Sequence, residues 1–420
     1  MPIACARSGS GVYTSLSGPY PDRTALRRKT PRMRTALYVP THGDYGDPQR
    51  LLALAKAAEA AGYDGFFIWD HLVLAPGAAL PLADATVVLG ALAQATHHMK
   101  LGALITPLSR RRPWKFAKEL TTLDQLSGGR VVCGVGLGEP VAVDFAPFGE
   151  VTAATTRAER LDEGLQIVDG LLRGQSVTHE GNHYRVENAR ISPACAQSPR
   201  LPIWVGATVA SKAGMRRAAR WDGYFPIRLP EAGAADPIAA TDCRNFWLEA
   251  SEFGEVVGHV RALREGAETA FEFLASGRTI YGDTEAATAT LAAYHEAGAT
   301  WWLEWVKEQP GTFEETLAAV KQGAPRAFPH PALPTVELRE AVRQLHAEID
   351  HTRSGDRETL GELRELLARI EHELAKAGTD SNLVQRLEAL KAGITRLEFA
   401  HPRATAILND IAMMLGNLGI

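Results

Sequence analysis

The sequence predicts an α/β protein built on a TIM-type (β/α)8 barrel. Short runs rich in β-branched and aromatic residues alternate with helical segments along most of the chain. The first repeats are roughly 30 to 36 residues long, and eight such runs occur within roughly 290 residues. This number and length of units fit a closed barrel better than an open, doubly wound sheet, which is the alternative architecture.

Four strands are expected in the first half of the barrel, at residues 35–40, 65–70, 100–106 and 131–136. Each is short and rich in aliphatic or aromatic residues, as buried parallel strands are. The first connecting helix is expected over residues 48–61, because Asp47-Pro48 is a common helix start and Gly62 a common helix end.

Four more strands complete the predicted barrel, at residues 203–208, 223–227, 271–275 and 300–306. Alanine-rich segments at residues 211–220 and 284–297 have the spacing of connecting helices. Between the fourth and fifth strands, residues 151–198 form an insertion, with an amphipathic helix at residues 157–172 and a hairpin around Glu180-Gly181-Asn182. We expect this insertion to cover the active-site face.

The two ends of the chain differ from the barrel in composition. Residues 1–32 carry six Lys or Arg and one acid, which predicts a disordered extension; a transit peptide shares this composition, and Met33 offers an alternative translation start. The barrel domain is expected over residues 33–326, followed by a proline-bearing linker at residues 327–335. Leucines at helical spacing predict a small all-α domain at residues 336–420, a kind of bundle that more often mediates assembly than chemistry.

Composition argues against several function classes. The formal net charge of −4 gives no support to nucleic-acid binding. No apolar run reaches the roughly 18 residues of a membrane span. The four cysteines have neither metal-ligand nor disulfide-framework spacing, so we expect no metal site and a cytoplasmic location; they are Cys5, Cys133, Cys195 and Cys243.

Polar and glycine residues follow several of the predicted strands. In a barrel of this type the C-terminal strand ends form the active-site face. This face is expected to collect Asp70 and His71, Thr106, the glycine run that ends at Glu139, and residues 206–208. Gly136 and Gly138 have no side chain, which lets a flat or phosphorylated ligand approach the backbone. Simpler readings are that His71 caps a loop and that the glycines turn the chain.

Ordered blocks of sequence span the predicted barrel. They are GYDGFFIWDHL, MKLGALITPLSRRRPWKFAKELTTLDQLSGGRVVCGVGLGE, RAERLDEGLQIVDGLLRGQSVTHEGNHYRV, LPIWVGATVASKAGMRRAARWDGYFP, AGATWWLEWV and GAPR. From about residue 33 to residue 326, these blocks together resemble the bacterial luciferase-like monooxygenase superfamily. The resemblance implies a barrel enzyme that uses reduced FMN with O2, or the deazaflavin coenzyme F420 for hydride transfer. The closing segment, HPRATAILNDIAMMLGNLGI, is similar to a small bacterial helical family of unknown function and adds no chemistry.

The resemblance also implies roles for particular residues. Asp70 and His71 occupy the position whose side chains face the cofactor ring, where a histidine often transfers protons. Glu139 matches an acidic position that some deazaflavin dehydrogenases use as a proton donor. Thr106 matches a hydroxyl that contacts the ring. The deazaflavin branch has a non-proline cis peptide bond in the third strand, which would fall between Ala103 and Leu104.

The phosphate side of the cofactor is implied to lie on the later loops. Gly206, Ala207 and Thr208 match the phosphate-side loop, although this sequence has Gly-Ala where relatives often have Gly-Gly. With Gly136 and Gly138, these residues complete the predicted cofactor set. The three arginines Arg110 to Arg112 follow the third strand, where they either attract an acidic substrate or, more simply, form a solvated loop.

The sequence therefore predicts a luciferase-like oxidoreductase, either a monooxygenase or a dehydrogenase, that acts on a small organic substrate with FMN or F420. A separate flavin reductase or F420-reducing dehydrogenase is the implied source of reduced cofactor, and a homo-oligomer is expected. The alternative is a non-catalytic flavin-binding or interaction protein on the same barrel, because a fold does not determine function. The substrate itself is not predicted.

Overall fold

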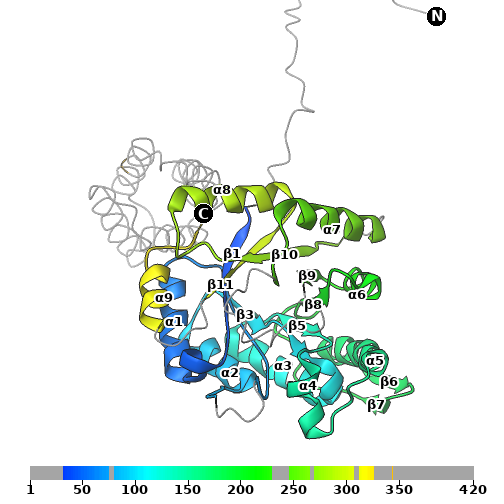
Figure 1. Ribbon diagram of the computed structural model, residues 1–420. Helices are drawn as coiled ribbons and strands as arrows, with labels where there is room; N and C mark the ends of the chain where they lie inside the picture. Colours follow the sequence, from blue (N-terminus) through cyan, green and yellow to red (C-terminus); the bar gives the residue numbers. More distant parts are fainter. Residues whose placement is uncertain are drawn as a thin grey trace, which may run out of the picture. The chain divides into compact units, whose positions relative to one another are not determined.

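The computed structural model describes residues 32–74, 80–228, 246–264, 269–306, 312–325 and 343. Apart from Arg32 and Arg343, the predicted N-terminal extension, linker and C-terminal helical domain lie outside this set. The described part is an α/β fold with helices packed around a parallel sheet (Figure 1).

Parallel strands form a nearly closed barrel, as predicted. They are β1 (Arg34–Val39), β2 (Gly65–Ile68), β3 (Lys100–Ala103), β4 (Thr106–Pro107), β5 (Cys133–Gly136), β8 (Ile203–Thr208), β9 (Gly223–Ile227), β10 (Glu272–Gly277) and β11 (Trp301–Trp305). Their order is β3-β2-β1-β11-β10-β9-β8-β5-β4. Strands β3 and β4 are two pieces of the predicted third strand, and a parallel bridge from Leu101 in β3 to Val131, just before β5, nearly closes the barrel.

Helices connect and surround these strands. The α-helices are α1 (Pro48–Ala60), α2 (Ala85–Ala95), α3 (Pro113–Ser127), α4 (Val141–Asp144), α5 (Ala154–Leu172), α6 (Lys212–Ala218), α7 (Ala250–Leu263), α8 (Thr284–Glu296) and α9 (Phe313–Val320), and the short 3₁₀ helices are η2 (Gly43–Gly46), η3 (Leu108–Arg110) and η4 (Ala146–Phe148). The predicted start of α1 is confirmed: the Asp47 side chain accepts a hydrogen bond from Gln49 N, and proline occupies the first turn. Within the described segments, each helix is too short or too polar to cross a bilayer.

Alternating side chains of the strands build two separate hydrophobic cores. Outward residues such as Phe66, Cys133 and Val205 pack against the helices. Inward residues fill the barrel with large aromatic groups; they include Tyr38, Phe67, Trp204, Phe225 and Trp301. Because almost all of this surface is removed from water, the aromatic interior is a main source of the barrel's stability.

The third strand is interrupted by a bulge, which corrects two predictions. The strand is not continuous over residues 100–106, and the cis peptide bond lies between Leu104 and Ile105, one bond later than predicted. The carbonyl of Leu104 accepts a hydrogen bond from the Tyr38 hydroxyl at 2.7 Å. A Cβ atom on Gly134 would lie 2.4 Å from the Leu104 side chain, so this glycine makes room for the bulge.

The hairpin of the insertion lies outside the barrel, so the prediction that the insertion covers the active-site face is wrong for this part. Strands β6 (Val177–Glu180) and β7 (Arg185–Ala189) run antiparallel beside α5 (Figure 1). Backbone N–H groups at the hairpin tip donate to the Glu163 carboxylate on α5, and the ring of Tyr184 packs against Trp114 of α3. These hydrogen bonds hold the hairpin against the helix layer instead of the strand ends.

Glu304 anchors the loop that follows β10. Its carboxylate is fully buried on the helix side of β11 and accepts hydrogen bonds from Thr279 N, Thr279 Oγ1, Ile280 N and Trp302 Nε1. Burial raises the pKa of Glu304, although these donors oppose the shift. Three of these four partners are N–H groups, which cannot accept a hydrogen bond from a side chain that itself donates.

We expect Glu304→Gln to lower the free energy of unfolding by about 1–3 kcal/mol, because in either orientation the amide nitrogen would face an N–H group that cannot accept a hydrogen bond. Urea unfolding of the full chain measures the change. Glu255→Gln, on the exposed face of α7, is the control and should change stability by less than about 0.5 kcal/mol. Equal effects for the two variants would contradict this role of Glu304.

Candidate active site

The mouth of the barrel is lined by aromatic rings. Trp69 follows β2 on the interior side, with its ring centroid 5.8 Å from Tyr38 and 5.5 Å from Trp305. The Trp69 residue is 8% exposed, and its indole Nε1 has no hydrogen-bond partner within the described segments. The mouth therefore offers an apolar surface together with an unused hydrogen-bond donor.

His71 lies at this mouth, as predicted. It follows Trp69 on the same side of the chain, and the two ring centroids are 5.8 Å apart. Its Nδ1 lies 3.2 Å from Oδ2 of Asp144, and the side chain is 17% exposed. Because a carboxylate only accepts hydrogen bonds, the Nδ1 atom carries the hydrogen of this contact. In the neutral imidazole, Nε2 is then the unprotonated nitrogen.

Asp144, at the end of α4, is the centre of this arrangement. Its side chain is 1% exposed, and Oδ2 also lies 2.8 Å from Nη1 of Arg110. Oδ1 accepts hydrogen bonds from Leu72 N at 2.8 Å and Val73 N at 3.1 Å. Burial alone raises the pKa of Asp144, but His71, Arg110 and the Val73 N–H group together lower it. The carboxylate is therefore ionised at neutral pH.

Sequence reasoning missed Asp144. The residue lies in the apolar stretch VAVDF, roughly 70 positions from His71, and neither spacing nor a turn signal connects the two. An acid within an apolar stretch was the available signal, because buried carboxylates need partners.

Asp70 points away from its neighbour His71. Its Oδ2 lies 2.9 Å from Nη2 of Arg111, whose Nη1 lies 3.2 Å from the Glu119 carboxylate. This pair attaches the loop after β2 to the start of α3. Arg110 and Arg111 neither attract an acidic substrate nor form a solvated loop, the two roles suggested by the sequence. Both guanidinium groups are held in ion pairs within the protein.

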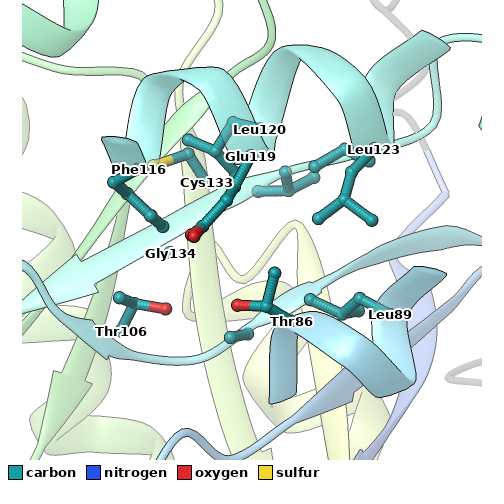
Figure 2. Close-up of a pocket in the computed structure, with 12 residues that line it drawn as sticks. Thr86, Leu89, Thr106, Phe116, Glu119, Leu120, Leu123, Cys133 and Gly134 are labelled. Carbon is teal, nitrogen blue, oxygen red and sulfur yellow. The ribbon is translucent and has the colours of Figure 1, made fainter. Parts of the chain in front are cut away.

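Thr106 faces the helices, so the prediction that its hydroxyl contacts a ring at the mouth is wrong. It pairs with Val135, an outward residue of β5. It lines a cavity of about 20 Å³ between the sheet and helices α2 and α3, with room for one water molecule. Figure 2 shows Thr106, Thr86 and Glu119 pointing into this space, which lies on the opposite side of the sheet from the barrel interior.

The other predicted residues of the third strand and the glycine run are used for packing. Ala103 lines the cavity behind the sheet, and Leu104 is buried in the barrel interior. A Cβ on Gly136 would lie 2.3 Å from Ile105 Cδ1, and a Cβ on Gly206 would lie 2.5 Å from Ile105 Cγ2. These two glycines leave room for the Ile105 side chain, a packing reason for glycine at both positions.

Gly138 and Glu139 shape the loop that leads to Asp144. Gly138 has a φ of +83°, and a Cβ there would meet Phe145 and Pro107 at 2.6 Å. The Glu139 side chain is 43% exposed; Oε1 lies 3.2 Å from Nη2 of Arg157, and Oε2 accepts a hydrogen bond from Val141 N. Glu139 is therefore a rim residue in an ion pair.

The predicted phosphate loop ends β8. Ala207 packs outward against Gly214, while Thr208 pairs with Ile227 on the interior side of the mouth. The helix that follows, α6, is capped by its own Ser211, whose hydroxyl accepts a hydrogen bond from Gly214 N. Of the three predicted residues, Thr208 is the one whose side chain faces the mouth.

The family model described as luciferase-like monooxygenase matches residues 33–396. The chain belongs to this family. The match extends past residue 326, where the barrel domain was expected to end, and covers much of the segment predicted as a separate helical domain. The likeness of that segment to a small helical family has no support from the comparisons.

Related sequences include F420-dependent enzymes. The chain is 36% identical over 183 residues to F420-dependent glucose-6-phosphate dehydrogenase of Microbacterium testaceum (strain StLB037), a match that covers 42% of this chain and 52% of that protein. It is 30% identical over 232 residues to an uncharacterized protein of Mycobacterium tuberculosis (strain ATCC 25618 / H37Rv), covering 51% of this chain and 72% of that protein. The chain thus spans about half the length of the dehydrogenase that it matches.

Solved structures share the fold at low identity. The F420-dependent tetrahydromethanopterin reductase of Methanopyrus kandleri has a TM-score of 0.55 at 16% identity, covering 70% of this chain and 98% of that one. The FMN complex of the type II Baeyer-Villiger 3,6-diketocamphane monooxygenase of Pseudomonas putida has a TM-score of 0.53 at 14% identity, covering 70% and 95%. These likenesses support the TIM-like barrel; at such identities they concern the fold alone.

We expect Asp144→Asn to destabilise the protein by about 3–5 kcal/mol at pH 7, because it leaves the buried Arg110 guanidinium without its anion. The lowered pKa of Asp144 means that its contribution is complete above the unfolded value of about 3.9 and is lost as pH falls through the folded value. Urea unfolding between pH 7 and pH 3 measures both effects.

The variant should therefore lose less stability on acidification than the wild-type protein does. Glu187→Gln, an exposed carboxylate on β7, is the control and should follow the wild-type curve. The same loss of stability on acidification in Asp144→Asn and wild type would show that Asp144 is not the linked group.

Proposed function

We propose that this protein is an oxidoreductase that uses the deazaflavin coenzyme F420 for hydride transfer with a small organic substrate, with His71 as its general acid–base. The observation that carries the proposal is the His71–Asp144 pair at the barrel mouth, 3.2 Å apart, beside buried aromatic rings. The relatives that are 34–36% identical and named as F420-dependent dehydrogenases favour the deazaflavin; FMN with O2 is the alternative.

The described residues at the mouth fit a flat, conjugated cofactor. Such a ring needs apolar surroundings and donors for its polar edge. Tyr38, Trp69 and Trp305 supply the apolar surface, and the unused Nε1–H group of Trp69 supplies a donor. The Thr208 hydroxyl, on the interior side of β8, would donate a hydrogen bond to the phosphate end of the cofactor. Bound deazaflavin would supply the hydride-transfer chemistry that no amino-acid side chain provides.

The protein's own contribution is to hold and move one proton. With Nδ1–H donated to Asp144, His71 presents Nε2 as the atom that accepts a proton from a substrate hydroxyl or returns it to a carbonyl oxygen. Asp144 stays ionised throughout and stabilises the imidazolium that forms. The buried rings of Trp69 and Trp305 exclude water from this face.

Glu139 has no part in the proton transfer that we propose. Its carboxylate lies at the rim, where one oxygen is paired with Arg157 and the other accepts a hydrogen bond from Val141 N. Asp70 likewise has a positioning role through Arg111. A separate F420-reducing dehydrogenase would supply reduced cofactor in this proposal.

The proposal predicts that the purified chain binds F420 more tightly than FMN, and that His71→Ala lowers turnover by about 100-fold or more while cofactor affinity is retained. Binding is measured by fluorescence titration with both reduced cofactors. Turnover is measured as F420 reduction with a substrate found by screening alcohols, sugar phosphates and aromatic acids. His98→Ala, at an exposed position, is the matched control and should leave turnover unchanged.

Three results would contradict parts of the proposal. Tighter binding of FMN would move the assignment to the flavin branch. Unchanged turnover in His71→Ala would remove this residue from the mechanism. Binding of either cofactor without turnover on any substrate class would favour a non-catalytic flavin-binding protein.

A further inference from the structure

One corner of the barrel mouth contains hydrogen-bond donors without matching acceptors. Arg278 follows β10 directly, and the alternation of that strand puts it on the interior side with Leu274. Its Nε donates to the carbonyl of Trp305 at 3.3 Å, and its Cζ lies 5.8 Å from the centroid of the Trp247 ring. The guanidinium therefore lies at the mouth beside β11.

Aromatic rings frame this guanidinium. Phe246 and Trp247 pack against Trp305, with ring centroids 5.7 and 6.2 Å away. The Nε1 atom of Trp247 is buried and has no hydrogen-bond partner in the described parts of the chain. Because a buried indole N–H normally finds an acceptor, this group indicates an acceptor that the described residues do not provide.

The charge balance of the mouth singles out Arg278. Four other arginines near the strand ends are neutralised by a carboxylate; the pairs are Arg110 with Asp144, Arg111 with Asp70, Arg157 with Glu139, and Arg228 with Glu252. Arg278 forms no ion pair with any carboxylate of the described residues. The corner thus combines one positive charge, the unused indole N–H donor of Trp247 and apolar walls.

We propose that this corner binds the carboxylate of a planar, aromatic acid, and that such acids are the substrate class of the site. The proposal rests on the oxidoreductase function proposed above. A guanidinium presents two parallel N–H groups that match the two oxygens of a carboxylate, and the rings of Trp247 and Trp305 pack well against a flat apolar body. One uncompensated positive charge also matches a monoanion better than a phosphate dianion.

The probe for this site is benzoate, titrated into the full-length protein and followed by calorimetry. We expect benzoate to bind the wild type, and Arg278→Gln to weaken it by about 10- to 100-fold, the usual effect of removing a charged hydrogen-bond partner. Arg278→Lys, which keeps the charge but loses the paired N–H groups, should give an intermediate loss. Benzamide, which is planar but neutral, should bind more weakly than benzoate and be insensitive to Arg278→Gln.

Arg228→Gln is the matched control, because Arg228 follows the neighbouring strand β9 and is already paired with Glu252. It should leave benzoate affinity unchanged. Absence of benzoate binding to the wild type, equal binding to Arg278→Gln, or displacement of benzoate by inorganic phosphate at equal concentration would overturn the proposal. Urea unfolding midpoints of the variants show whether a loss of binding reflects a loss of folding.

Cofactor titration separates this inference from the proposed function. The affinity of Arg278→Gln for reduced F420 should equal that of the wild type. If no cofactor binds while benzoate still depends on Arg278, the anion site stands and the oxidoreductase assignment fails. If cofactor binds and the affinity for benzoate does not depend on Arg278, the oxidoreductase assignment stands and the anion site fails.

Discussion

The ionised carboxylate of Asp144 is the interaction on which the rest of the candidate site depends. It joins α4 to the loop after β2 through two backbone N–H groups, and it compensates the charge of Arg110. It also holds the Nδ1 atom of His71. A buried anion is costly unless several donors surround it, and here every donor belongs to a segment that the active site needs. The loop is thus folded and the histidine oriented by the same group.

Steric fit imposes a second constraint inside the barrel. The bulge after β3 puts Leu104 and Ile105 in succession against the interior, where a regular strand would place alternate residues. The facing positions are Gly134, Gly136 and Gly206, and a Cβ at any of them would clash with one of these two side chains. Glycine at these three positions is therefore required for the barrel to close around its bulge.

These two constraints explain which features of the fold and of the candidate site could be predicted from the sequence. Strand positions were predictable because buried parallel strands are short apolar runs between turn residues, and His71 was predictable because it ends such a run. The outward direction of Thr106 was not, because the bulge after β3 shifts the alternation of side chains, and the partner of Asp70 was not, because Arg111 lies in a later segment of the chain. Asp144, Trp247 and Arg278 were missed because distant segments bring them to the mouth, and no local pattern marks such contacts.

The most direct test of this account is the tautomer of His71, which the nitrogen chemical shifts of the ring report in an NMR spectrum of labelled protein at neutral pH. If Asp144 orients the ring, the neutral imidazole carries its hydrogen on Nδ1 in the wild type, and Asp144→Asn shifts the population toward the Nε2–H form. An Nε2–H imidazole in the wild-type protein would contradict the account, because the nitrogen that faces the mouth would then be unable to accept a proton.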